Sequence, residues 1–339
     1  MMLSAGCGSG PSAVINNPTP TPSPTPVSTA KFMYVANEAS ASISGYSVNR
    51  NTGALTPLTG FPVSSGINPV YLIHDPQNKF LIVVDIAADN LRVYGIDPNT
   101  GALTEIAPSP YAVGKEPRAA AIDPSGQFVY VASQSLNSVA AFTMNASGVL
   151  TAVPGSPFAT GGTSTTGSFG SCVAIDPTGK FVFVGDLTSV YSFSVNTSNG
   201  ALTLVSTMPG SFENGLAVDP AQNFLYAVGG NFSIQTYNIN PTTGALTPFT
   251  ASPTGTHKGS FAIALDPAGS FAYTVEAGDT LVAYRLQNGV FTSLGDFYSG
   301  ALGSPQLAID PSGDFIYAPQ TGTDNDISGF QINTSGALS

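Results

Sequence analysis

Residues 123–132 read Asp-Pro-Ser-Gly-Gln-Phe-Val-Tyr-Val-Ala, a short turn followed by an apolar run. Proline at the second position and glycine at the fourth suit a type I turn, in which the aspartate accepts backbone N–H groups. The apolar run is typical of a strand that is covered on both faces. The Asp-Pro pair begins again at Asp75, Asp176, Asp219, Asp266 and Asp310, each time before an aromatic-led strand. The stretch is therefore one copy of a repeat.

A second motif, Gly-x-(Leu/Phe)-(Thr/Ser), gives the length of the repeat. It begins at Gly53, Gly101, Gly148, Gly200, Gly244, Gly289 and Gly336, at spacings of 44 to 52 residues. Each unit reads as four short strands, for example 118–122, 128–132, 138–144 and a fourth that begins at Gly148. These units predict an all-β fold, a seven-bladed β-propeller of four-stranded antiparallel blades. A linear β-solenoid is the runner-up, but its coils are usually shorter.

Composition excludes several classes of function. The chain of 339 residues has a net charge of −11, and 9% of its residues are charged. It therefore lacks the Lys/Arg surface that nucleic-acid binding needs. No apolar run reaches the roughly 18 residues of a membrane-spanning helix. A hydrophobic content of 42% excludes wholesale disorder.

The N-terminal region differs from the repeats, so we divide the chain into 1–30, a lipobox-like start with a proline-rich linker, and 31–339, the propeller. Residues 3–7, Leu-Ser-Ala-Gly-Cys, resemble a bacterial lipobox in which Cys7 is the lipid attachment site. Only Met1 and Met2 precede this motif, so either the start of the chain is misassigned, the interpretation we favour, or the resemblance is accidental. Residues 18–26, Pro-Thr-Pro-Thr-Pro-Ser-Pro-Thr-Pro, favour a polyproline II spacer. Together these features predict a protein of the bacterial cell envelope, lipid-anchored or secreted, in the periplasm or at the cell surface.

The two ends of the repeat predict an imperfect ring. Residues 21–27 stand where the innermost strand of the first blade would lie, and their prolines exclude a central strand. The spacing of the other repeats requires further residues beyond Ser339 to complete the last blade. We therefore expect an incomplete first blade of three strands, a truncated C-terminus and a weak seam between the first and last blades.

Comparison of the repeats with one another separates two faces of the ring. The turns between the first and second strands and between the third and fourth strands are nearly uniform, so their aspartates are expected to be structural. The connections between blades and the loops between the second and third strands vary, and such loops carry binding sites on a rigid scaffold. The ligand-binding candidates on this variable face are Arg118, Glu116, Asp186, Glu213, Asn214, His257 and Lys258. Their alternative interpretation is as solvated loop residues.

The repeats resemble the YVTN-type repeat and the lactonase, or 6-phosphogluconolactonase-like, seven-bladed propellers. The resemblance rests on residues 123–132 and on 51–57, Asn-Thr-Gly-Ala-Leu-Thr-Pro, and it extends from Phe32 to the C-terminus. It implies a lactone hydrolase with histidines and an arginine at the start of two inner strands and a glutamate in a loop.

The sequence departs from that catalytic set. Phe169 and Ser171 stand where the resemblance implies histidines, and Asn214-Gly215 stand where it implies an Arg-His pair. Residues 229–231 lack the glutamate, and only Asp186 is retained. We therefore leave the catalytic residues unassigned. The main hypothesis is an envelope-displayed module that binds a ligand or partner at the variable face, and lactone hydrolysis is the alternative.

Other polar or reactive residues are expected to have structural roles or to lack the spacing of a known site. His74 occupies a position that bulky apolar residues fill in other repeats, so we expect a buried imidazole with a lowered pKa. Cys172 lies within a strand and is expected in the core. Asp324-Asn325-Asp326 lacks the ligand spacing of a known calcium loop. We expect no metal or cofactor, a monomer, and a small molecule, glycan or protein as the ligand.

Overall fold

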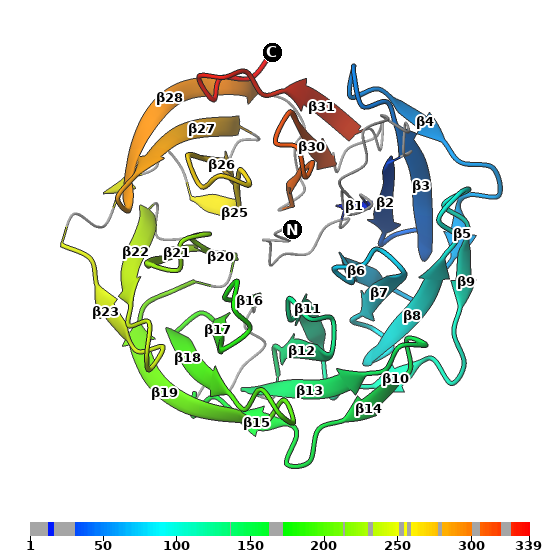
Figure 1. The fold of residues 1–339 in the computed structure, drawn as a ribbon, viewed down its shortest axis with the longest axis horizontal. Coiled ribbons are helices and arrows are strands. Elements are labelled where there is room, and N and C mark those ends of the chain that lie inside the picture. The colour runs from blue at the N-terminus through cyan, green and yellow to red at the C-terminus, as the bar shows by residue number, and fades with distance from the viewer. Residues whose placement is uncertain are drawn as a thin grey trace, which may run out of the picture.

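The computed structural model describes residues 13–16, 31–135, 137–162, 172–212, 214–229, 233–250, 254–255, 259–276, 280–299, 306–319 and 327–339. These residues form strands and turns, and the strands make seven antiparallel sheets. The sheets stand as blades around one axis (Figure 1), so the predicted β-propeller is confirmed. No helix in the part of the chain that the structure describes is long and apolar enough to cross a membrane.

The blades follow one another along the chain. Blade 1 contains β1 (Ala13–Asn16), β2 (Lys31–Asn37), β3 (Ser42–Val48), β4 (Leu55–Pro57) and β5 (Val63–Ser64). Blade 2 contains β6 (Pro69–His74), β7 (Phe80–Asp85), β8 (Asn90–Ile96), β9 (Leu103–Glu105) and β10 (Tyr111–Ala112), and blade 3 contains β11 (Pro117–Ile122), β12 (Phe128–Ser133), β13 (Ser138–Met144), β14 (Leu150–Ala152) and β15 (Phe158–Ala159). Blade 4 contains β16 (Cys172–Ile175), β17 (Phe181–Gly185), β18 (Ser189–Val195) and β19 (Leu202–Pro209). Blade 5 contains β20 (Gly215–Val218), β21 (Phe224–Val228), β22 (Ser233–Ile239), β23 (Leu246–Pro248) and β24 (Thr254–Gly255). Blade 6 contains β25 (Ser260–Leu265), β26 (Phe271–Glu276), β27 (Thr280–Gln287) and β28 (Val290–Ser299), and blade 7 contains β29 (Ala308–Ile309), β30 (Phe315–Pro319) and β31 (Ile327–Gln331).

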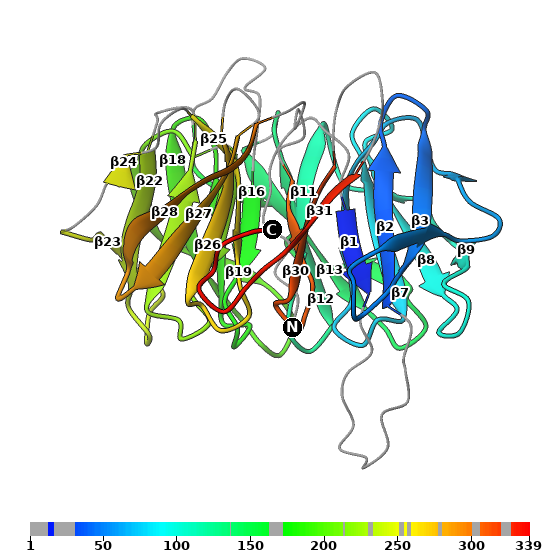
Figure 2. The ribbon, with the colours of Figure 1, turned by 90° about the horizontal axis from the view of Figure 1, so that it is seen from above.

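The fourth, outer strand takes two forms. In blades 4 and 6 it is one long strand, β19 or β28, paired along the third strand. In blades 1, 2, 3 and 5 it is divided into two short strands that both pair with the third strand. Seen from the side, the strands run between the two faces of the ring (Figure 2). We call the face with the Asp-Pro turns the turn face and the opposite face the loop face.

The Asp-Pro turns have the structural role that the repeat predicts. The carboxylate of Asp123 accepts hydrogen bonds from the backbone N–H groups of Ser125 at 3.0 Å and of Gln127 and Phe128, both at 2.7 Å. Asp176 and Asp310 make the corresponding bonds in their blades. Each aspartate therefore fixes the turn and the start of the second strand.

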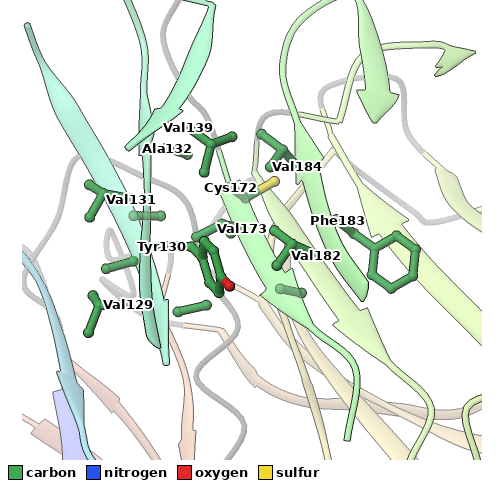
Figure 3. Close-up of a cluster of buried hydrophobic side chains, with 14 of the residues drawn as sticks. Val129, Tyr130, Val131, Ala132, Val139, Cys172, Val173, Val182, Phe183 and Val184 are labelled. Atoms are coloured by element: carbon green, nitrogen blue, oxygen red, sulfur yellow. The ribbon is translucent and has the colours of Figure 1, made fainter. Parts of the chain in front are cut away.

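The core lies between neighbouring blades. Figure 3 shows one such contact, where Tyr130 of β12 lies near Val173 of β16, and both are buried. Cys172 belongs to the same cluster and is 1% exposed, which confirms it as a core residue. Because each sheet is covered on both faces by its neighbours, its first two strands need apolar residues throughout.

Every seam between blades repeats one aromatic contact on the turn face. The first phenylalanine of a second strand packs against the glycine of the Gly-x-(Leu/Phe) motif in the next blade. The pairs are Phe32 with Gly101, Phe80 with Gly148, Phe128 with Gly200, Phe181 with Gly244, Phe224 with Gly289, Phe271 with Gly336 and Phe315 with Gly53. A Cβ on Gly200 would lie 2.4 Å from the Phe128 ring, and its φ is +79°. The motif glycine is thus required by both space and backbone conformation.

The last of these pairs closes the ring, since Phe315 is in blade 7 and Gly53 is in blade 1. The Tyr317 hydroxyl also donates to the Gly53 carbonyl at 2.8 Å. Near the axis, β29 contacts β25 and β1, and β1 contacts β6. The closing seam therefore has the same kinds of contact as the other seams.

The first blade corrects one prediction, because it is not incomplete. β1 pairs with β2, from Ala13 opposite Val35 to Asn16 opposite Phe32, and is its innermost strand. This strand comes from residues 13–16, which lie before the proline-rich segment and within the range 1–30 that the sequence assigns to the lipobox-like start and linker. Among the described residues blade 7 has three strands, and a bridge between Ile332 and Leu338 lies where its fourth strand would pair. Cys7 and the proline-rich segment lie outside the described residues.

Candidate functional site

Arg118 lies on the loop face at the start of the innermost strand of blade 3. In the pairing of β11 with β12, Pro117 is opposite Ser133 and Ala119 is opposite Ala132, so Arg118 is the extra residue of a β-bulge. A bulge redirects a side chain away from the regular strand pattern. The residue is only 8% exposed, and its Nε donates a 2.7 Å hydrogen bond to Oε1 of Gln134. The guanidinium is therefore held in one orientation.

The surroundings of Arg118 contain two carboxylates. Burial lowers the pKa of the Arg118 guanidinium, and the negative charges of Glu38 and Glu116 raise it. Arginine nevertheless stays protonated in proteins. Among the described residues, the hydrogen-bond partner of this guanidinium is Gln134, through Nε.

Glu116 is fixed by neighbours on both sides. Its φ is +51°, a left-handed conformation that is unusual for a residue other than glycine. Its N–H donates to Oδ1 of Asp89 at 2.9 Å, and its carbonyl accepts from the N–H of Gln134 at 3.0 Å. Its carboxylate accepts a hydrogen bond from the Ser135 hydroxyl. Such over-determined strain is a feature of functional sites.

Asp89, which fixes Glu116, is itself paired with a cation. Nζ of Lys115 lies 2.6 Å from Oδ2 of Asp89. This hydrogen bond to Lys115 lowers the pKa of Asp89, so the carboxylate stays ionised. Through Asp89, the loop between β7 and β8 of blade 2 thereby holds Lys115 and Glu116, which lie just before Arg118 in the chain.

Glu38 and Asn68 extend the site to blades 1 and 2. Nδ2 of Asn68 donates to Oε1 of Glu38 at 3.2 Å. The backbone N–H of Asn68 donates to Oδ1 of Asp85 at 3.1 Å, and Asp85 is wholly buried. We call the group Glu38, Asn68, Glu116, Arg118 and Gln134 the arginine site. It can hold a carboxylate or another planar oxyanion, which matches the paired donors of a guanidinium.

Asp186 and Asn214 make local contacts instead. Oδ1 of Asp186 accepts from the N–H and hydroxyl of Thr188, both at 2.7 Å, and from the N–H of Ser189 at 2.8 Å. Nδ2 of Asn214 donates to the Ser260 carbonyl at 2.9 Å, which connects blades 5 and 6. The structure therefore shows how these two residues hold loops, and their contact with a ligand stays a prediction.

The candidates Glu213, His257 and Lys258 lie outside the described residues. Of the predicted residues, the structure brings Arg118 and Glu116 together. Sequence reasoning missed Gln134 and Asn68 as members of the site, because neither belongs to a repeated motif. Their only signal is their position in loops of the variable face.

The comparisons with known proteins agree with the fold. The family model described as "Lactonase, 7-bladed beta-propeller" matches residues 69–262, more than half of the chain, so the chain belongs to this family. No curated protein sequence matches the chain.

Solved structures share the architecture at low identity. A Bacteroides fragilis protein provisionally described as a 6-phosphogluconolactonase is 21% identical, with 94% of this chain and 95% of that chain covered and a TM-score of 0.78. The periplasmic gluconolactonase of Pseudomonas aeruginosa is 18% identical, with 100% and 94% covered and a TM-score of 0.70. A Lactobacillus plantarum protein is 21% identical, with 100% and 95% covered and a TM-score of 0.73. At these identities the similarity shows the fold alone.

Proposed function

We propose that the protein binds a small carboxylate or related oxyanion at the arginine site. The observation that carries the proposal is Arg118, an arginine at 8% exposure whose Nε donates to Gln134 within the described part of the chain. In the proposal its two Nη nitrogens bind the ligand. A buried, oriented guanidinium loses little side-chain entropy when it binds, so its contacts count more than those of a surface arginine.

Lactone hydrolysis is the second candidate, and family membership favours it. Hydrolysis requires a base that activates water and a donor that stabilises the developing oxyanion. Glu38 is close enough to Arg118 to shift its pKa, so the arginine site contains one residue of each kind. In this reading Glu38 takes a proton from water while Arg118 stabilises the oxyanion.

The same variant tests both readings. We expect Arg118→Gln to weaken binding of acetate, gluconate or hexanoate at least tenfold, because a charge-assisted hydrogen bond is worth about 1.5–3 kcal/mol. Binding is measured by calorimetry or NMR titration, and hydrolysis of glucono-1,5-lactone and δ-hexalactone is measured by pH-stat. Arg285→Gln is the matched control, since Arg285 is exposed on β27. Equal carboxylate affinity in wild type and Arg118→Gln would refute the proposal, and turnover lost in Glu38→Gln would favour the hydrolase.

An envelope location is the further part of this proposal. It is supported by the lipobox-like motif at Cys7 and by the similarity to a periplasmic gluconolactonase. In that setting Cys7 carries the lipid and the loop face takes a ligand from outside the cytoplasm.

A further inference from the structure

The innermost strand of blade 1 is joined to its blade in an unusual way. In blades 2 to 7 the inner strand ends directly before an Asp-Pro turn, and the second strand begins after five residues, as with 123–127 between β11 and β12. In blade 1, β1 ends at Asn16 and β2 begins at Lys31, so the 14 residues 17–30 separate them. Among the seven inner strands that the structure describes, β1 is therefore the one that no short turn connects to its neighbour.

The register of β1 shows what this connection replaces. Asn16 is opposite Phe32, the phenylalanine that packs against Gly101. In blade 3 the residue opposite the corresponding phenylalanine is Asp123, whose N–H donates to the Phe128 carbonyl while Phe128 donates to its carboxylate. Asn16 thus stands at the position of the turn aspartate, but the chain reaches β2 only after 17–30. Pairing with β2 and contacts with β6 and β29 therefore hold β1 in place.

The two ends of 17–30 lie close together, although its sequence favours an extended segment. Because Asn16 and Phe32 are opposite each other on paired strands, their Cα atoms are about 5 Å apart. Residues 18–26 have proline at every second position, a composition that favours polyproline II with a rise of about 3.1 Å per residue. Fourteen residues of this kind span roughly 40 Å. A stiff segment whose preferred length far exceeds the distance to be spanned gives a low effective concentration for pairing within one chain.

The place that β1 occupies has to be filled by a strand. Met33 and Val35 of β2 are 0% and 4% exposed, and both lie opposite residues of β1. Without β1, the backbone N–H and C=O groups along this edge of β2 would lose their partners in the interior of the ring. The strand that meets this need comes either from the same chain or from a second copy.

From these features we propose that β1 exchanges between two copies of the chain, so that residues 13–16 of each copy complete blade 1 of the other. The exchange keeps every contact that β1 makes and removes only the closure of 17–30, so it is a low-cost route to a dimer. The sequence alone predicts a monomer, and the register of β1 is the observation that changes this expectation.

The exchange also determines how the two rings face each other. Phe32 begins β2 at the turn face and Asn16 lies opposite it, so 17–30 starts and ends at that face. The two turn faces are therefore opposed in the dimer. Both loop faces, with their arginine sites, point outwards, so carboxylate binding and dimer formation are independent of each other.

A hairpin graft tests the exchange in the full chain. In this variant Asp-Pro-Ser-Gly-Gln, copied from 123–127, replaces residues 16–31, so that β1 is joined to Phe32 by the turn of blade 3. We expect the wild type to be mostly dimeric at about 100 µM, because its stiff connection opposes pairing within the chain, and the graft to be monomeric. Sedimentation velocity in dithiothreitol, which keeps Cys7 reduced, measures both.

A second variant changes only the stiffness of the connection. The five prolines of 18–26 are each replaced by serine, which keeps the length and makes the segment flexible. We expect the dimer fraction at about 100 µM to fall at least threefold, because a flexible connection allows β1 to pair within its own chain. The control replaces the three threonines of 18–26 by serine and should leave the dimer fraction unchanged.

Mixing experiments show whether β1 is the element that joins the copies. Isotope-labelled wild type incubated with unlabelled wild type should give dimers of intermediate mass in native mass spectrometry, whereas labelled wild type with the unlabelled graft should not. A wild type that stays monomeric up to about 500 µM would overturn the proposal. A graft that dimerises, alone or with the wild type, would overturn it too, because another surface would then join the copies. If the graft does not fold, the proline variant decides, and an unchanged dimer fraction refutes the exchange.

Discussion

At the scale of single residues, His74 shows how one substitution in a repeat introduces a titratable group. It occupies the position that Ile122, Ile175 and Ile309 take in other blades. Its Nδ1 lies 2.8 Å from the Asp75 carbonyl oxygen, and the residue is partly buried. Burial lowers the pKa of His74 below its ordinary value of 6.5, so the folded protein favours the neutral imidazole.

This lowered pKa predicts a pH-dependent stability. The unfolded chain takes up a proton at His74 as the pH falls through 6.5, and the folded protein does so only at lower pH, because burial lowers the pKa. The stabilisation is thus fully present above pH 6.5 and is lost below it, by up to about 1.4 kcal/mol per pH unit. We expect the wild type to lose more free energy of unfolding than His74→Ile between pH 7.5 and 5.5, measured by urea unfolding. Equal losses in the two proteins would contradict the prediction.

At the scale of strands, the seams show compensation between neighbouring strands. The hydroxyls of Tyr34, Tyr130, Tyr273 and Tyr317, all in second strands, donate to the carbonyl of a motif glycine in the next blade. Blade 4 has Phe183 at this position, which has no donor. Ser192, opposite Phe183 on β18, donates to the Gly244 carbonyl instead. In blade 5 the third strand also supplies the donor, since Thr236 donates to the Gly289 carbonyl at 3.1 Å although Tyr226 stands opposite it. The donor to the motif glycine therefore comes from the third strand in blades 4 and 5.

A double variant tests this compensation. Ser192→Ala removes the donor and leaves the Gly244 carbonyl buried, so we expect a loss of about 1–2 kcal/mol in the free energy of unfolding. Adding Phe183→Tyr should restore most of the loss, because its hydroxyl takes the place that Tyr130 fills at Gly200. Urea unfolding of the single and double variants gives the coupling. Independent, additive effects would show that the two positions do not share one bond.

The strands also show what sequence can and cannot predict. Residues 128–132 and 138–144 correspond to β12 and β13, because the repeat gives the same pattern several independent times. β1 was missed, since four residues before a proline-rich segment carry no repeat motif and acquire strand structure only by pairing with β2. The sequence also placed Arg118 and Glu116 on the variable face. Their partners Gln134 and Asn68 depend on the exact approach of separate loops, which no local pattern encodes.

At the scale of the whole molecule, ring closure decides whether the blades unfold together. The sequence predicts a weak seam between blades 7 and 1. The structure instead gives this seam the Phe315–Gly53 contact of every other seam and a Tyr317 hydrogen bond like those made by Tyr34, Tyr130 and Tyr273. We therefore expect the ring to unfold as one cooperative unit.

The same substitution at two seams tests this expectation. A Cβ on Gly53 would lie 2.5 Å from the Phe315 ring, and one on Gly200 would lie 2.4 Å from the Phe128 ring. We expect Gly53→Ala and Gly200→Ala to destabilise the protein equally, by about 2–4 kcal/mol from backbone strain and overpacking. Gly60→Ala is the control for strain alone, because φ is +87° there and no atom lies within 4 Å. Rapid hydrogen exchange confined to blades 1 and 7 in Gly53→Ala, with an unchanged unfolding midpoint, would show that the seam opens independently.

The aromatic contacts have a consequence for the history of such rings. Each repeat carries a phenylalanine that contacts the next blade and a motif glycine that contacts the previous blade, so every repeat contributes both residues needed for these contacts. Unequal recombination between two repeats adds or deletes a whole repeat, and every phenylalanine still finds a motif glycine in the next blade. The phenylalanine–glycine contacts therefore place no limit on the number of blades, and the curvature of the sheets sets the size of the ring.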